Sequence, residues 1–177
     1  MTARRLVAAL LALLSPMAVG TAAHAAPPQS AFRILNASAN NIPLCLGIAG
    51  GDMTDGTAAL QWHCNGAVDQ TWVVAPTDGG WLRLINKATY DNDPTHWSCL
   101  GVQGASIAPG ARLVIWHCNG SPDQQWSPGP TSPRSWSNIT NRNSGLVIAV
   151  SGGGTAEGLN IIQWSAGYTG DKLWTYV

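Results

Sequence analysis

Short apolar runs separated by polar turns fill the chain from about residue 32 to its end. The runs are four to six residues long and rich in Ile, Val, Leu and Trp, and clusters of Gly, Asn, Asp and Pro separate them. Such runs, bounded by turn residues, predict short β-strands. No window keeps the 3.6-residue apolar period of a substantial helix. The pattern therefore predicts an all-β chain.

The runs recur three times in one order. Each copy opens on a segment like R-I-L-N, continues with one like C-L-G-I and one like L-Q-W-H-C-N-G, and ends on D-x-x-W. The opening segments are 33–36, 83–86 and 138–141; the next are 45–48, 99–102 and the degenerate 147–150; the third are 60–66, 114–120 and 162–167; the endings are 69–72, 123–126 and 171–174.

Three copies of about four strands each predict some twelve strands. A single copy cannot bury its apolar face alone, so three copies should close around a shared core with a pseudo-threefold axis. That arrangement is a β-trefoil, and it is favoured over a β-sandwich because sandwich strands need not repeat in threes. The repeats span about 32–78, 79–130 and 131–177.

The N-terminal segment is typical of a secretory signal peptide. Arg4 and Arg5 precede an apolar run from residue 6 to about residue 19, and small residues follow up to Ala25. We expect cleavage after Ala25, a short linker over 26–31 and one domain over 32–177. The apolar run is too short for a membrane anchor. The mature protein is therefore expected to be secreted.

Charge gives the mature chain no strong electrostatic partner. Without Arg4 and Arg5, seven Lys and Arg face nine Asp and Glu. This balance lacks the clustered positive charge that favours nucleic acid or an anionic membrane, so we expect neither as a partner. About 152 residues suffice for one domain, which we expect to be a monomer.

Four cysteines in an exported chain favour disulfides. The repeat symmetry selects the pairs Cys45–Cys64 and Cys99–Cys118, each separated by nineteen positions in similar local sequence. The alternative is a metal site that uses the His-Cys pairs at 63–64 and 117–118. Their spacing is not that of a C-x-x-C or H-x-x-x-H site, so we expect no metal and no cofactor.

With three endings in register, the chain resembles the ricin B-type lectin family, whose β-trefoils carry three Q-x-W endings. The resemblance covers about residues 32–177, and the third ending departs from it as K-L-W. It implies a β-trefoil with up to three shallow sugar pockets, one per repeat. It also implies a structural role, in the core and in tying repeats together, for the endings Trp72, Trp126, Trp174, Gln70 and Gln124.

A second set of tryptophans carries the functional hypothesis. In this family an aromatic residue near the third strand stacks on the sugar, and an adjacent polar side chain binds a sugar hydroxyl. The alternative is that these tryptophans cover the disulfide or the end of the barrel. The matching candidates for carbohydrate binding are Trp62, Trp116 and Trp164, with Asp69, Asp123 and Asp171.

The chain also departs from the galactose-binding members. Those members carry an Asp two residues after the first Cys of a repeat, where this chain has Gly47, Gly101 and Ala149. The usual galactose pocket is therefore in doubt in every repeat. Asp52 and Asp55 follow directly in a Gly-rich loop, so we expect the first copy to hold the best pocket. The alternative is that both are ordinary turn residues.

One insertion breaks the symmetry. Twelve residues separate Asn86 from Cys99, against eight in the first copy, and residues 90–97 (YDNDPTHW) include two aromatics, two acids and a His. Surface insertions often carry function, so this loop is a candidate site for a protein partner. The alternative is a solvated excursion with Trp97 folded back on the barrel.

Catalysis has little support in the sequence. It contains no G-x-S-x-G and no H-E-x-x-H motif. Asp69 with His63 and Asp123 with His117 form a pair of equal spacing, but recurrence in two repeats favours shared structure over an active site. We therefore expect a secreted, non-enzymatic protein that binds a glycan or polysaccharide. The alternative is a β-trefoil that has lost its sugar pockets and binds or inhibits a protein.

Overall fold

The computed structural model describes residues 30–38, 42–91, 95–129 and 135–177. These residues form short strands joined by turns and single-turn 3₁₀ helices, with one four-residue helix, α1 (Lys87–Tyr90). The strands are β1 (Ala31–Phe32), β2 (Ile34–Asn36), β3 (Leu44–Ile48), β4 (Ala59–His63), β5 (Trp72–Pro76), β6 (Leu82–Asn86), β7 (Ser98–Val102), β8 (Leu113–His117), β9 (Val147–Val150), β10 (Ile161–Trp164) and β11 (Trp174–Tyr176).

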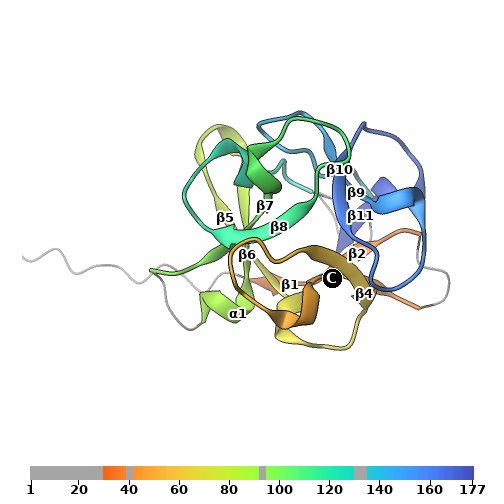
Figure 1. Ribbon diagram of the computed structural model, residues 1–177, viewed down its shortest axis with the longest axis horizontal. Helices are drawn as coiled ribbons and strands as arrows, with labels where there is room; N and C mark the ends of the chain where they lie inside the picture. Colours follow the sequence, from red (N-terminus) through yellow and green to blue (C-terminus); the bar gives the residue numbers. More distant parts are fainter. Residues whose placement is uncertain (1–29, 39–41, 92–94, 130–134) are drawn as a thin grey trace, which may run out of the picture.

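The strands are antiparallel and surround a common centre, with the first repeat in orange and yellow, the second in green and the third in blue (Figure 1). They pair in the orders β1-β5-β6-β7-β8, β11-β2-β3-β4 and β10-β9. The fold is a β-trefoil, as the three repeats predict. Fewer than twelve strands are described because the ending of the second repeat and the opening of the third form isolated bridges instead of strands. There Trp126 pairs with Leu82 and Asn141, and Thr140 pairs with Val147.

Three tryptophans occupy equivalent places in the core. Trp72, Trp126 and Trp174 are completely buried. The indole N–H of each donates a hydrogen bond of 2.9 Å to a backbone carbonyl 26 residues earlier, at Leu46, Leu100 and Ile148 respectively. A buried indole N–H needs such a partner, because leaving it unsatisfied would cost about 1–3 kcal/mol. The bond fixes each repeat ending against its own second strand.

The remaining core follows the same threefold order. Each copy contributes one apolar residue from each of four segments, and all of these residues are at most 2% exposed. The sets are Ile34, Leu84 and Ile139; Leu46, Leu100 and Ile148; Ile48, Val102 and Val150; and Ala59, Leu113 and Ile161. All belong to one continuous cluster, so no repeat has a core of its own.

Buried asparagines tie each repeat to the one before it. The side-chain N–H₂ of Asn86 donates to the carbonyl of Asp69, and that of Asn141 donates to the carbonyl of Asp123. Asn36 closes the ring by donating to the carbonyl of Gly170 in the third repeat. The opening segments thus fix the turns that carry the pocket aspartates.

Two disulfides join neighbouring strands in the first two repeats. Cys45 pairs with Cys64 and Cys99 with Cys118, with 5.1 Å between the Cα atoms in both. The pairing predicted from repeat symmetry is confirmed. In the third repeat the second strand has Val147 at the corresponding position, and its pairing with Trp164 rests on backbone hydrogen bonds.

Candidate functional site

Each repeat carries one surface pocket, and the second set of tryptophans lines all three. Trp62, Trp116 and Trp164 are 38%, 41% and 43% exposed, in contrast to the completely buried tryptophans that end the repeats. Their pockets have volumes of about 340, 270 and 290 Å³. An indole that is partly exposed in a hollow presents an apolar face to a ligand. These hollows are the size of a single small ring or slightly larger.

A carboxylate lies in every pocket beside the tryptophan. Asp69, Asp123 and Asp171 line the first, second and third pockets respectively. They lie on single-turn 3₁₀ helices, η2 (Val68–Gln70), η5 (Pro122–Gln124) and η7 (Gly170–Lys172). A carboxylate accepts but does not donate hydrogen bonds, so it suits a partner rich in hydroxyl groups.

Gly47 explains how the first pocket keeps an acid without the usual Cys-x-Asp pattern. A Cβ on Gly47 would lie 3.0 Å from Asp69 Oδ2 and 3.0 Å from Gln70 Cγ. The same Oδ2 accepts a hydrogen bond of 3.2 Å from the backbone N–H of Ile48. The Asp69 carboxylate therefore occupies the space that a side chain at position 47 would need.

The second repeat has the same arrangement, with an aspartate beside a glycine, and the third repeat does not. A Cβ on Gly101 would lie 3.3 Å from Asp123 Oδ2 and 3.0 Å from Gln124 Cγ. Asp123 is only 9% exposed, so its carboxylate lies deep in the pocket. In the third repeat the residue at this place is Ala149, which carries a Cβ and lines the pocket.

Each tryptophan packs against a loop of the preceding repeat. The N–H groups of Gly56, Gly110 and Gly158 donate to the carbonyls of Ile115, Gln163 and Gln61, the residues just before the pocket tryptophans. A Cβ on these glycines would lie 3.5–3.7 Å from the indole Cζ3 atoms of Trp116, Trp164 and Trp62. All three have φ between 78° and 93°, which glycine adopts without strain. The second pocket is therefore lined by two repeats, because Gly56 belongs to its wall, and in all three repeats the pocket tryptophan packs against the preceding copy.

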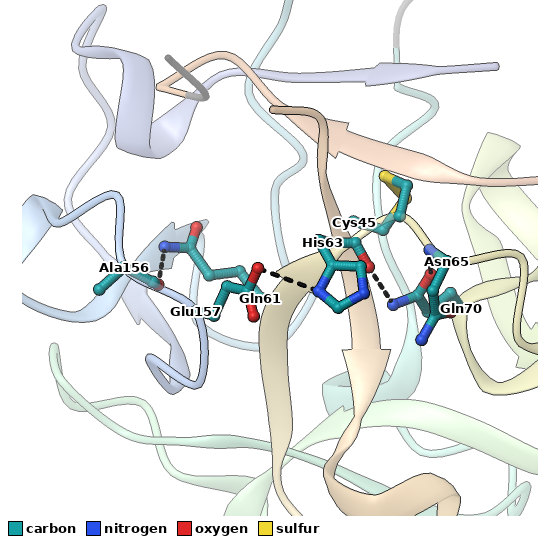
Figure 2. A network of polar contacts seen from close by, with 8 residues as sticks. Cys45, Gln61, His63, Asn65, Gln70, Ala156 and Glu157 are labelled. Carbon is teal, nitrogen blue, oxygen red and sulfur yellow. Dashed lines mark hydrogen bonds and ion pairs between the residues drawn. A yellow bond between two sulfur atoms is a disulfide. The ribbon is translucent and has the colours of Figure 1, made fainter. Parts of the chain in front are cut away.

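Two of these loops bring an acid to a histidine beside the tryptophan. Asp55 accepts from the backbone N–H of His117 at 2.6 Å, and its second oxygen lies 2.6 Å from Nδ1 of the same residue. In the first repeat His63 Nδ1 lies 3.0 Å from Oε1 of Glu157, which comes from the third repeat (Figure 2). Both pairs are solvent-exposed, so they contribute little to stability.

Neither Asp52 nor Asp55, the candidates expected in the first pocket, is among the residues that line it. Asp55 lies against the second repeat, because the loop after β3 crosses to the next copy. Asp52 closes a turn by accepting from the N–H and hydroxyl of Thr54, at 2.9 and 2.6 Å. Hydrogen bonds from Thr54 lower the pKa of the Asp52 carboxyl, as expected of a turn residue.

The structure does not form the Asp69–His63 pair that the sequence spacing suggests. The His63 ring nitrogen bonds to Glu157 of the third repeat, and the His117 ring nitrogen bonds to Asp55 of the first. Asp69 instead lines the first pocket and accepts a hydrogen bond from the backbone N–H of Ile48. Equivalent acid–histidine contacts at two places indicate a repeated structural feature.

Buried glutamines hold the floor of the pockets. The Gln70 amide donates to the carbonyl of His63 at 2.9 Å and accepts from the N–H of Asn65 at 3.1 Å (Figure 2). Gln124 makes the same two bonds in the second repeat. Gln61 donates to the carbonyls of Gly154 and Ala156, which anchors the loop that carries Glu157. These bonds fix the backbone segments on either side of the pocket tryptophans.

The insertion between β6 and β7 folds back on the barrel. The rings of Tyr90 and Trp97 stack with centroids 4.9 Å apart. Both pack on a small cluster of buried residues that includes Val73 and Cys99. Residues 92–94 of the candidate loop lie outside the described residues. A protein partner at this loop stays a prediction, and the two aromatic faces on which it depended are occupied by each other and by the barrel.

The part of the chain that the structure describes contains no group of three or more His, Cys, Asp or Glu side chains arranged to hold a metal ion. Nor does any helix among the described residues have the length and apolarity to cross a membrane.

The loop glycines that pack against the pocket tryptophans were not identified from the sequence. Gly56, Gly110 and Gly158 each lie six residues before a pocket tryptophan, and this spacing is visible in the sequence. It does not reveal that each glycine contacts the tryptophan of the next repeat. The carboxylate at Asp69 was among the candidates, but its occupation of the empty space at Gly47 became visible only in three dimensions.

The chain belongs to the family of ricin-type β-trefoil lectin-like domains, whose model matches residues 24–92 and 95–164. The fold and the family are those of lectin-like carbohydrate-binding modules. No curated protein matches the chain by sequence.

Several solved structures share the fold. The designed threefold symmetric protein ThreeFoil has a TM-score of 0.74 at 21% identity, with 83% of this chain and 97% of that chain covered. An exo-β-1,3-galactanase from Clostridium thermocellum has a TM-score of 0.74 at 24% identity, but the match covers 85% of this chain and only 30% of the galactanase. A Macrolepiota procera ricin B-like lectin in complex with lactose has a TM-score of 0.65 at 18% identity, covering 86% and 97%.

Proposed function

We propose that the protein binds carbohydrate in its three tryptophan pockets. Trp62, Trp116 and Trp164 would stack on the apolar face of a sugar ring, and the neighbouring aspartates would accept hydrogen bonds from its hydroxyls. The observation that carries the proposal is the threefold recurrence of an exposed indole beside a carboxylate in a hollow of 270–340 Å³. The lactose complex of a lectin with the same fold supports it.

The chemistry of the pockets suits a neutral sugar. The C–H face of a pyranose packs on an indole, and its hydroxyls require polar partners on the same side. Asp69 Oδ2 accepts a hydrogen bond from the backbone N–H of Ile48, which fixes the carboxylate in the pocket before a ligand binds. Preorganisation of this kind raises affinity because less side-chain freedom is lost on binding.

The sugar preference should differ from that of galactose-binding relatives. Their acid extends from the second strand of a repeat, whereas Asp69 and Asp123 extend from the turn that follows the third strand. The acceptor thus reaches the pocket from a different direction. We propose that the pockets bind a sugar whose hydroxyl arrangement is not that of galactose.

A glycan array tests the proposal. We expect the mature protein to bind a limited set of glycans, and Trp62→Ala and Trp116→Ala each to weaken that binding at least tenfold. The matched control is Trp136→Ala: Trp136 is 46% exposed, similar to the pocket tryptophans, but lines none of the three tryptophan pockets. Absence of binding to every glycan, or equal effects of the pocket and control variants, would contradict the proposal.

The setting of this activity is also a proposal. We propose that residues 1–25 form a signal peptide, that residues 32–177 form the mature binding domain, and that this domain acts outside the cell as a monomer without catalysis. The two disulfides support an oxidising compartment. Mass spectrometry of the protein recovered from culture medium would test the cleavage: an N-terminus at residue 26 is expected, and retention of Arg4 and Arg5 would contradict it.

A further inference from the structure

The third pocket differs from the other two in its charged groups. Where the first two repeats have Gln70 and Gln124, the third has Lys172. Each glutamine amide is fully engaged, donating to one backbone carbonyl and accepting from one backbone N–H. A lysine ammonium only donates and cannot replace the accepting bond. Replacing glutamine by lysine therefore removes the side-chain acceptor for that backbone N–H and introduces a positive charge.

Lys172 belongs to the wall of that pocket. It lines the pocket together with Trp164 and Asp171, and its Nζ lies 3.4 Å from the place of a Cβ on Gly167. In the parts of the chain that the structure describes, no carboxylate lies within ion-pair distance of this ammonium, and that includes the adjacent Asp171. Its charge is available to a ligand.

The loop that packs on Trp164 also lacks the acid of the other two loops. The loop that reaches this pocket has Pro109 before Gly110, where the other two loops have Asp55 and Glu157. The residue after Trp164 is Ser165, where the other pockets have a histidine. Both members of the acid–histidine pair have therefore changed together.

These differences give the pockets different electrostatic preferences. The lining of the first pocket contains Asp69 and that of the second contains Asp123, and among the described residues neither lining contains a lysine or an arginine. An anionic ligand would meet a carboxylate there and no cation. The third pocket holds one carboxylate, Asp171, and one ammonium, Lys172, so the charges in its wall balance.

We propose that the third pocket binds an acidic sugar residue, one that carries a carboxylate or a sulfate group. Trp164 stacks on the ring, and Lys172 pairs with the anionic group. The inference rests on the proposed function, because it takes the tryptophan pockets to be sugar sites. It adds that one protein presents two pockets for neutral sugar and one for acidic sugar.

The experiment uses the nine indole N–H signals of the mature protein in two-dimensional NMR, assigned through Trp→Ala variants. The probes are a neutral disaccharide chosen from the array, its glucuronate-terminated analogue and its sulfated analogue. At least one acidic probe should shift the Trp164 signal more strongly than those of Trp62 and Trp116. Its affinity at Trp164 should fall as salt rises from 20 to 300 mM.

Two variants separate charge from fold. Lys172→Gln restores the Q-x-W ending of the other repeats, so it should fold normally, and it should weaken binding of the acidic probe at Trp164 about tenfold. Lys172→Arg should retain that binding. Unchanged affinity in Lys172→Gln would overturn the inference.

The neutral probe separates the two levels of the argument. If neutral sugars shift Trp62 or Trp116 and neither acidic probe shifts Trp164, the inference fails and the proposed function stands. If no probe moves any of the three pocket signals, both fail.

Discussion

At the scale of single residues, the first two pockets depend on a pair of positions: one lacks a side chain, and the carboxylate of the other fills the space. Gly47 and Gly101 lack side chains, and the carboxylates of Asp69 and Asp123 take up the space that results. This arrangement moves the acid from a strand to the following turn while keeping it in the pocket. A small residue at position 47 is thus a requirement of packing as well as a departure from the family pattern.

Gly47→Ala should therefore destabilise the fold by about 1–3 kcal/mol, because the new methyl group meets Asp69 Oδ2 and Gln70 Cγ at 3.0 Å. Urea unfolding of the variant measures this. In an Asp69→Ala background the same substitution should cost clearly less, because one of the two contacts is gone. Equal costs in the two backgrounds would show that Asp69 does not fill the space at position 47.

Tyr176 provides a prediction about pH. Its ring packs on the core and lies 4.5 Å from that of Phe32, and burial raises the pKa of Tyr176 to about 12, from an ordinary value of 10.0. Below pH 10 both states keep the phenolic proton, so its contribution to stability is complete. Between pH 10 and 12 the unfolded chain loses the proton first, and stability falls.

At pH 11 this loss amounts to about 1.4 kcal/mol relative to pH 9. Tyr176→Phe should abolish it, as measured by urea unfolding at the two pH values. Tyr168→Phe is the control because Tyr168 is 94% exposed, and it should retain the loss. If wild type and Tyr176→Phe lost the same stability between pH 9 and pH 11, the loss would not come from Tyr176.

At the scale of elements, the loop after the second strand of each repeat packs against the pocket tryptophan of the next repeat. The backbone bonds of Gly56, Gly110 and Gly158 fix this crossover three times. The sequence predicted the repeats, the disulfide pairs and the exposed tryptophans, because each of these follows from local pattern and internal symmetry. It did not predict which pocket Asp55 approaches, because that depends on how far a loop crosses between copies.

The crossover predicts where a loop substitution acts. Asp55→Ala should shift the indole N–H signal of Trp116, since it releases His117 beside that ring, and should leave the signal of Trp62 in place. Glu157→Ala should do the reverse, because Glu157 contacts His63. Two-dimensional NMR of the two variants forms a matched pair. A shift of the Trp62 signal in the Asp55 variant would contradict the crossover, because it would mean that the loop contacts the tryptophan of its own repeat.

At the scale of the whole molecule, the three repeats share one core and separate its two sets of tryptophans. One set closes the core through indole bonds to Leu46, Leu100 and Ile148. The other set faces outward in the pockets. The sequence predicted this division because the two sets occupy different places in the repeat. The isolated bridges where the second repeat ends and the third begins reflect pairings that local pattern does not encode.

Trp126→Ala should lower the free energy of unfolding by about 3–5 kcal/mol, because it empties a fully buried site and leaves the carbonyl of Leu100 without its side-chain donor. Thermal and urea unfolding would measure the change. Trp136→Ala, at an exposed position, should change stability by less than about 0.5 kcal/mol. Similar losses in the two variants would contradict the division of the tryptophans.

The most direct test of the central claim is calorimetric titration with the neutral glycan that binds best. The number of sites per molecule should fall by one in Trp62→Ala and by one in Trp116→Ala. In the double variant the sites at both tryptophans should be lost. Trp136→Ala should leave the number unchanged. Full binding by the double variant would contradict the account, because the sugar would then bind outside the tryptophan pockets.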